Sequence, residues 1–198
     1  MCANRNKRSL TVNLAPEEGQ AVIRRLSMRG DVLVENVKVG DMARHGLDAA
    51  TLRAAHPRLV YCSITGFGQD GPYAQRAGYD FAVQGLGGLM SVTGAADGEP
   101  QKVGVAVADL FTGMYATVAI LAALRHRDAT GEGQAIDMAL LDAQVAMLAN
   151  LGSHYLVGGE VPARQGNAHA NIVPYQVFAV ADGHSIVAVG NERQFARR

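Results

Sequence analysis

The sequence predicts an α/β fold in which parallel strands alternate with helices that cross over the sheet. The first reason is the alternation of short β-branched apolar runs with amphipathic segments through the first third of the chain. The second reason is composition. Hydrophobic residues make up 48% of the 198 residues and charged residues 18%, which suits a packed core rather than a disordered chain. A chain of this length is one domain with some sequence left over.

Three runs in the first third have the composition of strands, at residues 10–14, 31–36 and 59–65. A helix is expected to open at Pro16 and close at Gly30, because proline suits a helix start and glycine suits its end. A shorter helix is expected over residues 49–55, capped by Asp48 and stopped by Pro57. Since no crossover precedes the first strand, sequence is expected to be missing upstream of it.

The third strand is followed by a glycine-rich segment, G-F-G-Q-D-G at residues 66–71, which formally fits the dinucleotide-binding fingerprint. We reject that interpretation because Pro72 and polar residues follow where an apolar helix is required. The acidic residue needed about 20 positions further on is also absent, since Asp80 is too near and Asp97 is too far. The glycines are expected to make a tight turn or to let the backbone approach a ligand.

The most informative stretch covers residues 102–116 and has the sequence K-V-G-V-A-V-A-D-L-F-T-G-M-Y-A. Small apolar residues lead to a lone carboxylate, Asp109, where an apolar helical pattern begins that continues over residues 110–124. Aspartate at such a place is a good helix cap, and the helix N-terminus favours its ionised form. A carboxylate kept anionic at the edge of an apolar cleft can also act as a nucleophile. From this pattern alone, both roles stay open.

The remaining expected elements are a strand over 134–139, a helix over 142–151, a hairpin with strands over 175–180 and 184–189, and a helix capped by Asn191 and cut off at Arg198. The hairpin is predicted by the alternation on both sides of a turn that contains Asp182. Asp137 and Asp142 are expected to hold backbone rather than to do chemistry. We therefore divide the chain into a large domain over 1–160 and the start of a smaller α+β domain over 161–198.

Charge and motif content argue against several classes of function. The 18 basic and 18 acidic residues balance, which argues against a nucleic-acid partner. Two cysteines and six scattered histidines show neither a disulfide framework nor metal-ligand spacing, so no metal is expected. Neither a phosphate-binding P-loop nor a serine nucleophile elbow is present. The apolar run over 113–124 is shorter than the roughly 20 residues that span a bilayer. We therefore expect a soluble, cytoplasmic protein without a membrane partner.

Several segments, in order along nearly the whole chain, carry a family resemblance: N-R-N-K-R-S, D-V-L-V-E-N with Gly40 and Arg44 beyond it, Y-C-S-I-T-G-F-G-Q-D-G-P-Y, R-A-G-Y-D, V-A-V-A-D-L-F-T-G-M-Y-A, T-G-E-G-Q-A-I-D and G-N-A-H-A-N-I-V-P-Y-Q-V-F. As a set they resemble the class III coenzyme A transferases, the family of the formyl-CoA and carnitine CoA-transferases. The run to Gln194 and Phe195 is most similar to the branch that acts on dicarboxylic acids such as succinate and glutarate.

The resemblance implies a Rossmann-like large domain, a smaller domain and a homodimer of interlocked subunits. It implies acyl-CoA and a free carboxylic acid as substrates, with no permanently bound cofactor. Asp109 matches the family's catalytic aspartate, which forms an anhydride and then an aspartyl-CoA thioester. The expected CoA contacts are Val12, Asn13, Leu14, Ala15, Asn36, Val37, Lys38, Arg44, Thr65, Gly66, Phe67 and Gly68. A substrate loop that covers the active site in formyl-CoA transferase matches His169, Ala170 and Asn171.

Three departures from the family pattern bear on these expectations. Ala15 stands where relatives carry a lysine, so Lys38 or Lys7 would have to replace that phosphate contact. The related acyl-CoA racemases carry a histidine immediately before the aspartate that corresponds to Asp80, and Tyr79 in its place argues against racemisation. Family members also extend beyond both ends of this chain. We therefore expect a fragment that is inactive by itself, and a non-catalytic remnant of the family stays open as an alternative.

Overall fold

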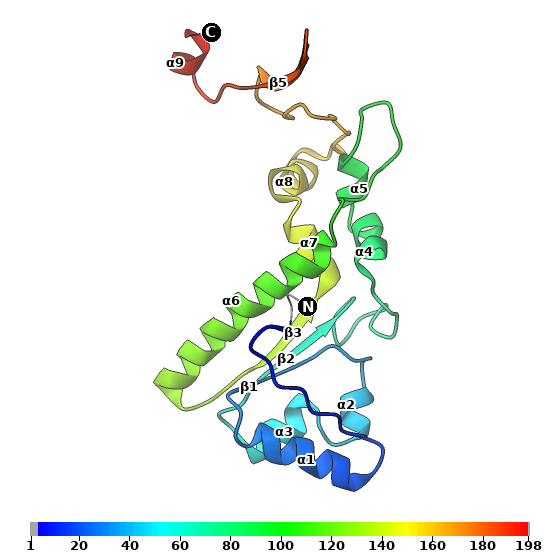
Figure 1. The fold of residues 1–198 in the computed structure, drawn as a ribbon, viewed down its shortest axis with the longest axis vertical. Coiled ribbons are helices and arrows are strands. Elements are labelled where there is room, and N and C mark those ends of the chain that lie inside the picture. The colour runs from blue at the N-terminus through cyan, green and yellow to red at the C-terminus, as the bar shows by residue number, and fades with distance from the viewer. Residues whose placement is uncertain (1–3, 198) are drawn as a thin grey trace. The chain divides into compact units, whose positions relative to one another are not determined.

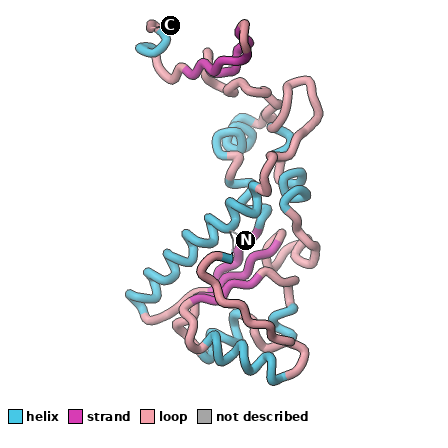
Figure 2. The backbone as a smooth tube through the Cα atoms, in the orientation of Figure 1, coloured by secondary structure: helices cyan, strands magenta, loops and turns pink. Residues whose placement is uncertain are grey.

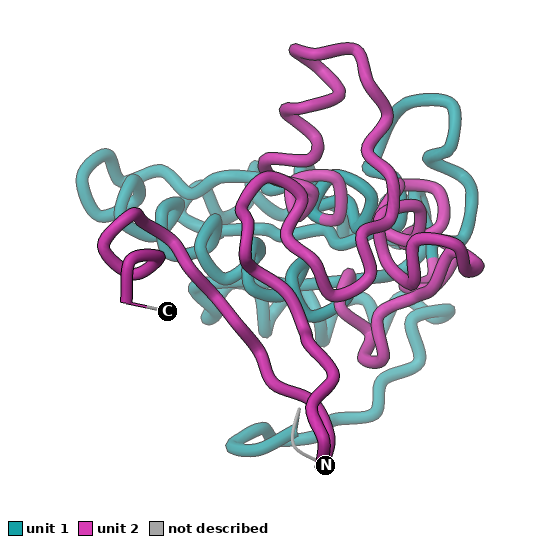
Figure 3. The backbone as a smooth tube through the Cα atoms, turned by 90° about the horizontal axis from the view of Figure 1, so that it is seen from above, with its two compact units in different colours: residues 1–78, 109–143 teal, residues 79–108, 144–198 magenta. Residues whose placement is uncertain are grey.

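The computed structural model describes residues 4–197 and divides the chain into two compact units (Figure 3). The first unit comprises residues 1–78 and 109–143, and the second comprises residues 79–108 and 144–198. The main chain passes from the first unit to the second and back before it enters the second unit again. The division into a large domain up to residue 160 and a smaller one after it stays a prediction.

The first unit contains a parallel three-stranded sheet in the order β1-β2-β3 (Figure 2). Its strands are β1 (Val32–Glu35), β2 (Val60–Thr65) and β3 (Ala135–Ala139). The register aligns Glu35 with Ser63 and Ser63 with Asp137, so these three side chains leave the same face of the sheet. The parallel α/β architecture predicted from the sequence is confirmed.

Helices cover both faces of this sheet. Figure 1 shows α1 (Glu17–Ser27), α2 (Asp41–Arg44) and α3 (Ala49–Ala55) on one side of the strands and α6 (Val107–Thr130) along the other. Leu47, Leu52, Leu59 and Tyr61 form the buried core between the sheet and α3. The predicted cap of α3 is confirmed, because Thr51 donates from its backbone N to Asp48 Oδ1 at 3.0 Å.

The strand predicted over residues 10–14 does not form. Asn13 turns the backbone locally, because its Oδ1 accepts a hydrogen bond from the backbone N of Ala15 at 3.0 Å. The carbonyl of Asn13 also packs against Gly19 of α1, where an added Cβ would lie 1.7 Å from that oxygen. Within the described residues, no strand pairs with this segment, so alternation of side chains alone is not enough to make it a strand.

Helix α6 buries a narrow stripe of small side chains, namely Thr112, Ala116 and Ala123. Its large apolar side chains are exposed instead, each by 41% or more: Leu110, Phe111, Met114, Tyr115, Val118 and Leu121. By length and composition α6 could cross a membrane, a property it shares with core helices of soluble proteins. The prediction that no apolar segment is long enough for this is therefore wrong, because the helix has 24 residues rather than the shorter run read from the sequence.

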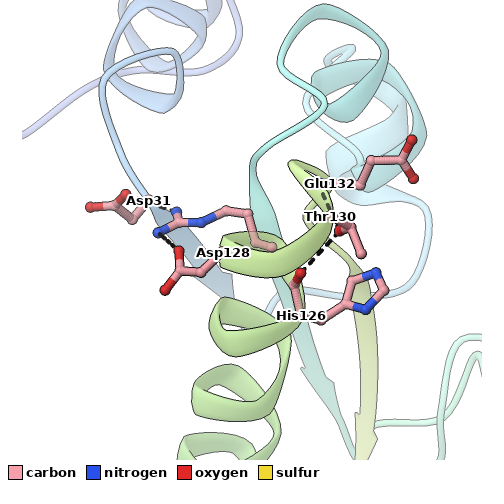
Figure 4. A network of polar contacts seen from close by, with 6 residues as sticks. Asp31, His126, Asp128, Thr130 and Glu132 are labelled. Carbon is pink, nitrogen blue, oxygen red and sulfur yellow. Dashed lines mark hydrogen bonds and ion pairs between the residues drawn. The ribbon is translucent and has the colours of Figure 1, made fainter.

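The C-terminal end of α6 is tied to the start of the sheet (Figure 4). Arg127 Nη1 donates to Asp31 Oδ1 at 2.8 Å, next to the first residue of β1. Thr130 Oγ1 donates to the carbonyl of His126 at 2.9 Å, and Gly131 with φ +84° ends the helix. The C-terminal end of α6 is therefore anchored to the sheet, opposite the first turn of the helix.

The second unit contains short helices and a hairpin. Its elements are α4 (Asp80–Leu86), α5 (Leu89–Val92), α8 (Ala149–Gly158), β4 (Tyr175–Val180), β5 (Gly183–Ala188) and α9 (Glu192–Phe195), and α7 (Leu140–Ala146) leads into it from the first unit. The antiparallel hairpin and the Asn191 cap are confirmed. The single helix predicted over 142–151 is wrong, because α7 ends at Ala146 and α8 begins at Ala149, where φ is 47°. Helix α9 ends at Phe195, and Arg198, the predicted cut-off, lies outside the described residues.

Candidate functional site

Asp109 is the third residue of α6, so its carboxylate belongs to the first turn of a long helix. The predicted N-cap position is wrong, because the helix begins at Val107, two residues earlier than the pattern indicates. The helix still favours a negative charge there, since the backbone N–H groups and the helix dipole act over the whole first turn. The residue is exposed. An exposed carboxylate at a helix N-terminus is favoured in the ionised form, which a nucleophile requires.

The backbone that leads into Asp109 is held by side chains of α4. Asp80 Oδ1 accepts a hydrogen bond from the backbone N of Ala108 at 2.8 Å. Gln84 Oε1 accepts another from the backbone N of Val103 at 2.9 Å, and Gln84 Nε2 donates to Asp80 Oδ2 at 2.7 Å. Asp80 thus does part of the capping that the sequence pattern assigns to Asp109.

The glycine-rich turn after β2 is built on a close backbone contact. A Cβ added to Gly66 would lie 2.3 Å from the Cα of Gly78, so the two glycines lie back to back. Gly68 has φ +88°, and its N–H donates to Thr65 Oγ1 at 2.9 Å. Because no helix follows the strand before Asp80, the rejection of a dinucleotide fingerprint is supported.

The same turn is fixed to β3. The backbone N of Gln69 donates to Asp137 Oδ2 at 2.8 Å, and the backbone N of Leu141 donates to the carbonyl of Gly66 at 3.1 Å. Asp137 therefore holds backbone, as predicted. The same prediction for Asp142, which lies in the first turn of α7, stays a prediction. These bonds hold the expected CoA-contact loop over Thr65, Gly66, Phe67 and Gly68 at the carboxyl end of the sheet.

The expected phosphate ligand Arg44 is the last residue of α2 and forms an ion pair with Asp41. Its side chain is 72% exposed, so a ligand can reach the guanidinium without rearrangement of the fold. Asn36, Val37 and Lys38 follow β1, and all three are exposed. The carboxylate of Asp41 orients the Arg44 guanidinium and competes with any phosphate for it.

A cavity of about 260 Å³ lies between the strands of the sheet and the helices α2 and α3. Among the expected CoA contacts, Lys38 is the one that lines it. Three carboxylates also line it, from Glu35, Asp48 and Asp137. Within residues 4–197, no group of three or more potential ligands is arranged to hold a metal ion. Three carboxylates and one lysine give the cavity a negative charge, which does not favour a phosphate group.

The titration of the neighbouring groups reflects this negative environment. Burial raises the pKa of Tyr61, and the carboxylates of Glu35 and Asp48 raise it further. Burial likewise raises the pKa of the Cys62 thiol, with further contributions from Glu35 and Asp137. A buried thiol with a raised pKa is a poor nucleophile, so Cys62 does not compete with Asp109 for a chemical role.

The expected substrate loop lies in the second unit. The backbone N of His169 donates to the carbonyl of Tyr175 at 2.9 Å, and the centres of the two rings are 5.2 Å apart. The backbone N of Asn171 donates to His169 Nδ1 at 3.0 Å, whereas Ala170 is exposed. The loop is therefore folded onto the start of β4, and Tyr175 makes this local contact. The role of this loop at a substrate stays a prediction.

The chain belongs to CoA-transferase family III, whose sequence model matches residues 1–198. A succinate–glutarate CoA-transferase from Agrobacterium fabrum is 57% identical over 98% of this chain and 48% of that protein. The succinyl-CoA:glutarate CoA-transferase of Homo sapiens is 44% identical over 99% of this chain and 45% of that protein. The crystal structure of a CAIB/BAIF family protein from Brucella suis matches with a TM-score of 0.86 at 54% identity, over 96% of this chain and 50% of that one.

These relatives confirm the family resemblance and the α/β fold. The chain spans about half the length of the relatives it matches. CoA-transferases use CoA thioesters as substrates and have no permanently bound cofactor. The individual CoA contacts stay predictions.

Sequence reasoning misses the Asp80–Gln84 pair and the acidic cavity. In the sequence, Asp80 is noted for its distance from the glycine loop and for the racemase comparison at Tyr79, and neither points to Gln84. A carboxylate and an amide four residues apart on one helix nevertheless form a natural pair. The cavity cannot be found from the sequence, because it depends on the register that brings Glu35, Ser63 and Asp137 into one row.

Proposed function

We propose that the protein transfers coenzyme A from an acyl-CoA thioester to a free carboxylic acid. The observation that carries this proposal is the place of Asp109 in the first turn of α6, immediately after a backbone segment held by Asp80 and Gln84. Membership of CoA-transferase family III supports the reaction class. The names of the relatives support dicarboxylic acids such as succinate and glutarate as substrates.

In the proposed mechanism, a carboxylate oxygen of Asp109 attacks the thioester carbonyl carbon, and the carbon–sulfur bond breaks. This gives a mixed anhydride and CoA thiolate. The thiolate then attacks the Asp109 carbonyl carbon of the anhydride, which releases the donor acid and leaves an aspartyl-CoA thioester. The acceptor carboxylate attacks that thioester, and the released thiolate attacks the acyl carbon of the new anhydride. The products are the new acyl-CoA and free Asp109.

Each attack places negative charge on a carbonyl oxygen. We assign the stabilisation of this charge to backbone N–H groups of the glycine turn. The turn is suited to this task by its rigidity, since Gly66 packs on Gly78 and Asp137 holds Gln69. Arg44 is assigned to the CoA phosphates, on the strength of its exposed guanidinium and the preference of that group for phosphate.

We also propose a homodimer in the cytoplasm. The dimer is supported by the exposed large apolar side chains of α6, such as Phe111 and Leu121, because exposed apolar patches commonly mark protein interfaces. The cytoplasmic location is supported by the balanced charge and the soluble substrates. Racemisation is not proposed, since Tyr79 stands where the racemases carry a histidine.

The direct genetic test replaces Asp109 in the protein as its gene encodes it. Asp109→Asn and Asp109→Ala are expected to abolish CoA transfer while leaving CoA binding largely intact, because they remove the nucleophile and little contact area. Steady-state transfer assays and a CoA binding isotherm measure the two quantities. Substantial turnover by Asp109→Ala, with contamination excluded, would show that the mechanism is wrong.

A further inference from the structure

Two side chains of α4 fix both ends of the segment that precedes the proposed nucleophile. Gln84 holds the backbone N of Val103 at 2.9 Å, and Asp80 holds the backbone N of Ala108 at 2.8 Å. A third bond of 2.7 Å, from Gln84 Nε2 to Asp80 Oδ2, joins the two side chains. Gln84 and Ala108 are completely buried. The three bonds are partly buried, so a mismatched partner in them is costly.

The direction of these hydrogen bonds is dictated by the backbone. The N–H groups of Val103 and Ala108 can only donate, so the side chains that face them must accept. Gln84 therefore presents Oε1 to Val103 and Nε2 to Asp80. The group at position 80 must then accept on both sides, from Gln84 and from Ala108. A carboxylate does this and a carboxamide cannot.

Between its two anchored ends the segment makes short-range contacts, since Lys102 Nζ donates to the carbonyl of Gly104 at 3.4 Å and the backbone N of Val107 donates to the carbonyl of Val105 at 2.8 Å. Gly104 has no atom within 4 Å of the position that a Cβ would take, and Val105 is 59% exposed. Ala108 is the residue immediately before Asp109 in the first turn of α6. The path of the backbone into that turn is thus set by α4 at Val103 and at Ala108.

We propose that Asp80 is a positioning residue for Asp109 and that Gln84 sets the hydrogen-bonding direction on which this role depends. The inference rests on the proposed function, because it concerns the geometry of the same nucleophile. Asp80 supplies no atom to the reaction. It holds the first turn of α6 so that the Asp109 carboxylate meets the thioester carbon at the productive distance, where displacement by about 1 Å can cost a factor of about 100 in rate.

A charge-swap experiment tests this proposal. In Asp80→Asn, positions 80 and 84 both carry an amide. However these two amides are turned, at least one NH₂ group faces another donor, either the other amide or the backbone N–H of Val103 or Ala108. In the double variant Asp80→Asn with Gln84→Glu, the new carboxylate at position 84 accepts from Val103 and from the new amide at position 80, whose oxygen accepts from Ala108. The double variant restores all three bonds, with nearly unchanged size and the same net charge. The matched control is Asp97→Asn, which removes the same charge from an exposed turn of the same unit.

The measurements are kcat and the KM for acyl-CoA, with the rate of CoA attachment to Asp109 in a single turnover. We expect Asp80→Asn to lower kcat and the attachment rate about ten- to a hundredfold at an unchanged KM. The double variant is expected to recover most of that loss, and Asp97→Asn to match the wild type. A wild-type kcat in Asp80→Asn, or a double variant no faster than Asp80→Asn, overturns the proposal.

Folding and chemistry are separated by the design. If Asp80→Asn does not fold, the comparison passes to the double variant, whose network is complete and whose kcat must then approach that of the wild type. If it folds with an unchanged CoA affinity, the fall in kcat reports on positioning. Turnover by Asp109→Ala contradicts the proposed function itself. If Asp109→Ala loses turnover but Asp80→Asn turns over like the wild type, the positioning role is contradicted and the proposed function is not.

Discussion

Gly66 and Gly78 lie against each other through their α-carbons, so that a Cβ on Gly78 would lie 2.2 Å from the Cα of Gly66. No side chain fits between them, and the contact closes the turn that follows β2. The loop over residues 66–78 is held in this way at the carboxyl end of the sheet, where α/β proteins place their ligands.

We expect Gly78→Ala to lower the free energy of unfolding by about 1–3 kcal/mol, because the methyl group overpacks a backbone contact. Chemical denaturation measures this change. The matched control is Gly113→Ala in α6, where an added Cβ meets nothing within 4 Å and alanine favours the helix. A Gly78→Ala variant as stable as Gly113→Ala would show that the two glycines are not in contact.

Asp48 gives a prediction about pH. Burial acts to raise the pKa of its carboxyl, but hydrogen bonds from Thr51 and the backbone outweigh burial, and the pKa is lowered from 3.8. A lowered pKa in the folded state gives stability that is complete above the unfolded value and is lost as pH falls through the folded value. We expect Asp48→Ala to cost about 1 kcal/mol at neutral pH, and less in acid.

Asp48→Asn is the control for that experiment, because asparagine caps a helix about as well as aspartate and does not titrate. Its difference in stability from Asp48→Ala should therefore stay constant between neutral and acidic pH. Thermal melts of the three proteins across this range make the comparison. If the wild type and Asp48→Asn lose stability in parallel, Asp48 does not contribute to the acid dependence.

Arg44→Ala is expected to weaken CoA binding more than it slows the reaction at saturating substrate. A charge-assisted phosphate contact is worth about 1.5–3 kcal/mol, which corresponds to a rise in the Kd of about tenfold or more. Isothermal titration with CoA measures it. The matched control is Arg29→Ala, which removes an exposed arginine outside the expected contact set. An unchanged Kd in Arg44→Ala would remove Arg44 from the CoA site.

The isolated 198-residue chain is expected to self-associate and to lack CoA-transferase activity. The reason is the outer side of α6, where Met114 is 66% exposed and Val118 is 62% exposed. Size-exclusion chromatography with light scattering, combined with a transfer assay, tests both statements. Replacing Val118 with glutamate should reduce the association if this surface drives it. A monomeric, cooperatively melting and active chain would contradict the prediction.

Local signals predict much of the fold. Asp48 and Pro57 delimit α3 because capping and helix termination depend on neighbouring residues. The run over 31–36 contains β1 because β-branched apolar residues favour a strand. Residues 10–14 show the same kind of pattern but no strand, because a strand also needs a partner that the sequence pattern does not reveal. The pattern misplaces the start of α6 because small apolar residues suit either a strand or a helix.

The candidate site is predictable only in part. Asp109 is recognisable from its surroundings and from the family, and its place in the first helical turn agrees with the proposed role. The support from Asp80 and Gln84 is not predictable, because two directed hydrogen bonds join α4 to Val103 and Ala108, 19 and 28 residues further along the chain. A third bond joins the two side chains within α4. Such bonds depend on tertiary packing, which periodicity does not encode.

A search for the covalent intermediate on Asp109 tests the proposed mechanism most directly. The protein as its gene encodes it is incubated with succinyl-CoA without an acceptor acid, digested and examined by mass spectrometry, with Asp109→Asn as the control. We expect CoA attached through a thioester to the peptide that contains Asp109, and no such adduct in the variant. CoA attached to another residue would contradict the mechanism, as would turnover in the presence of an acceptor acid without any adduct on Asp109 under rapid quenching.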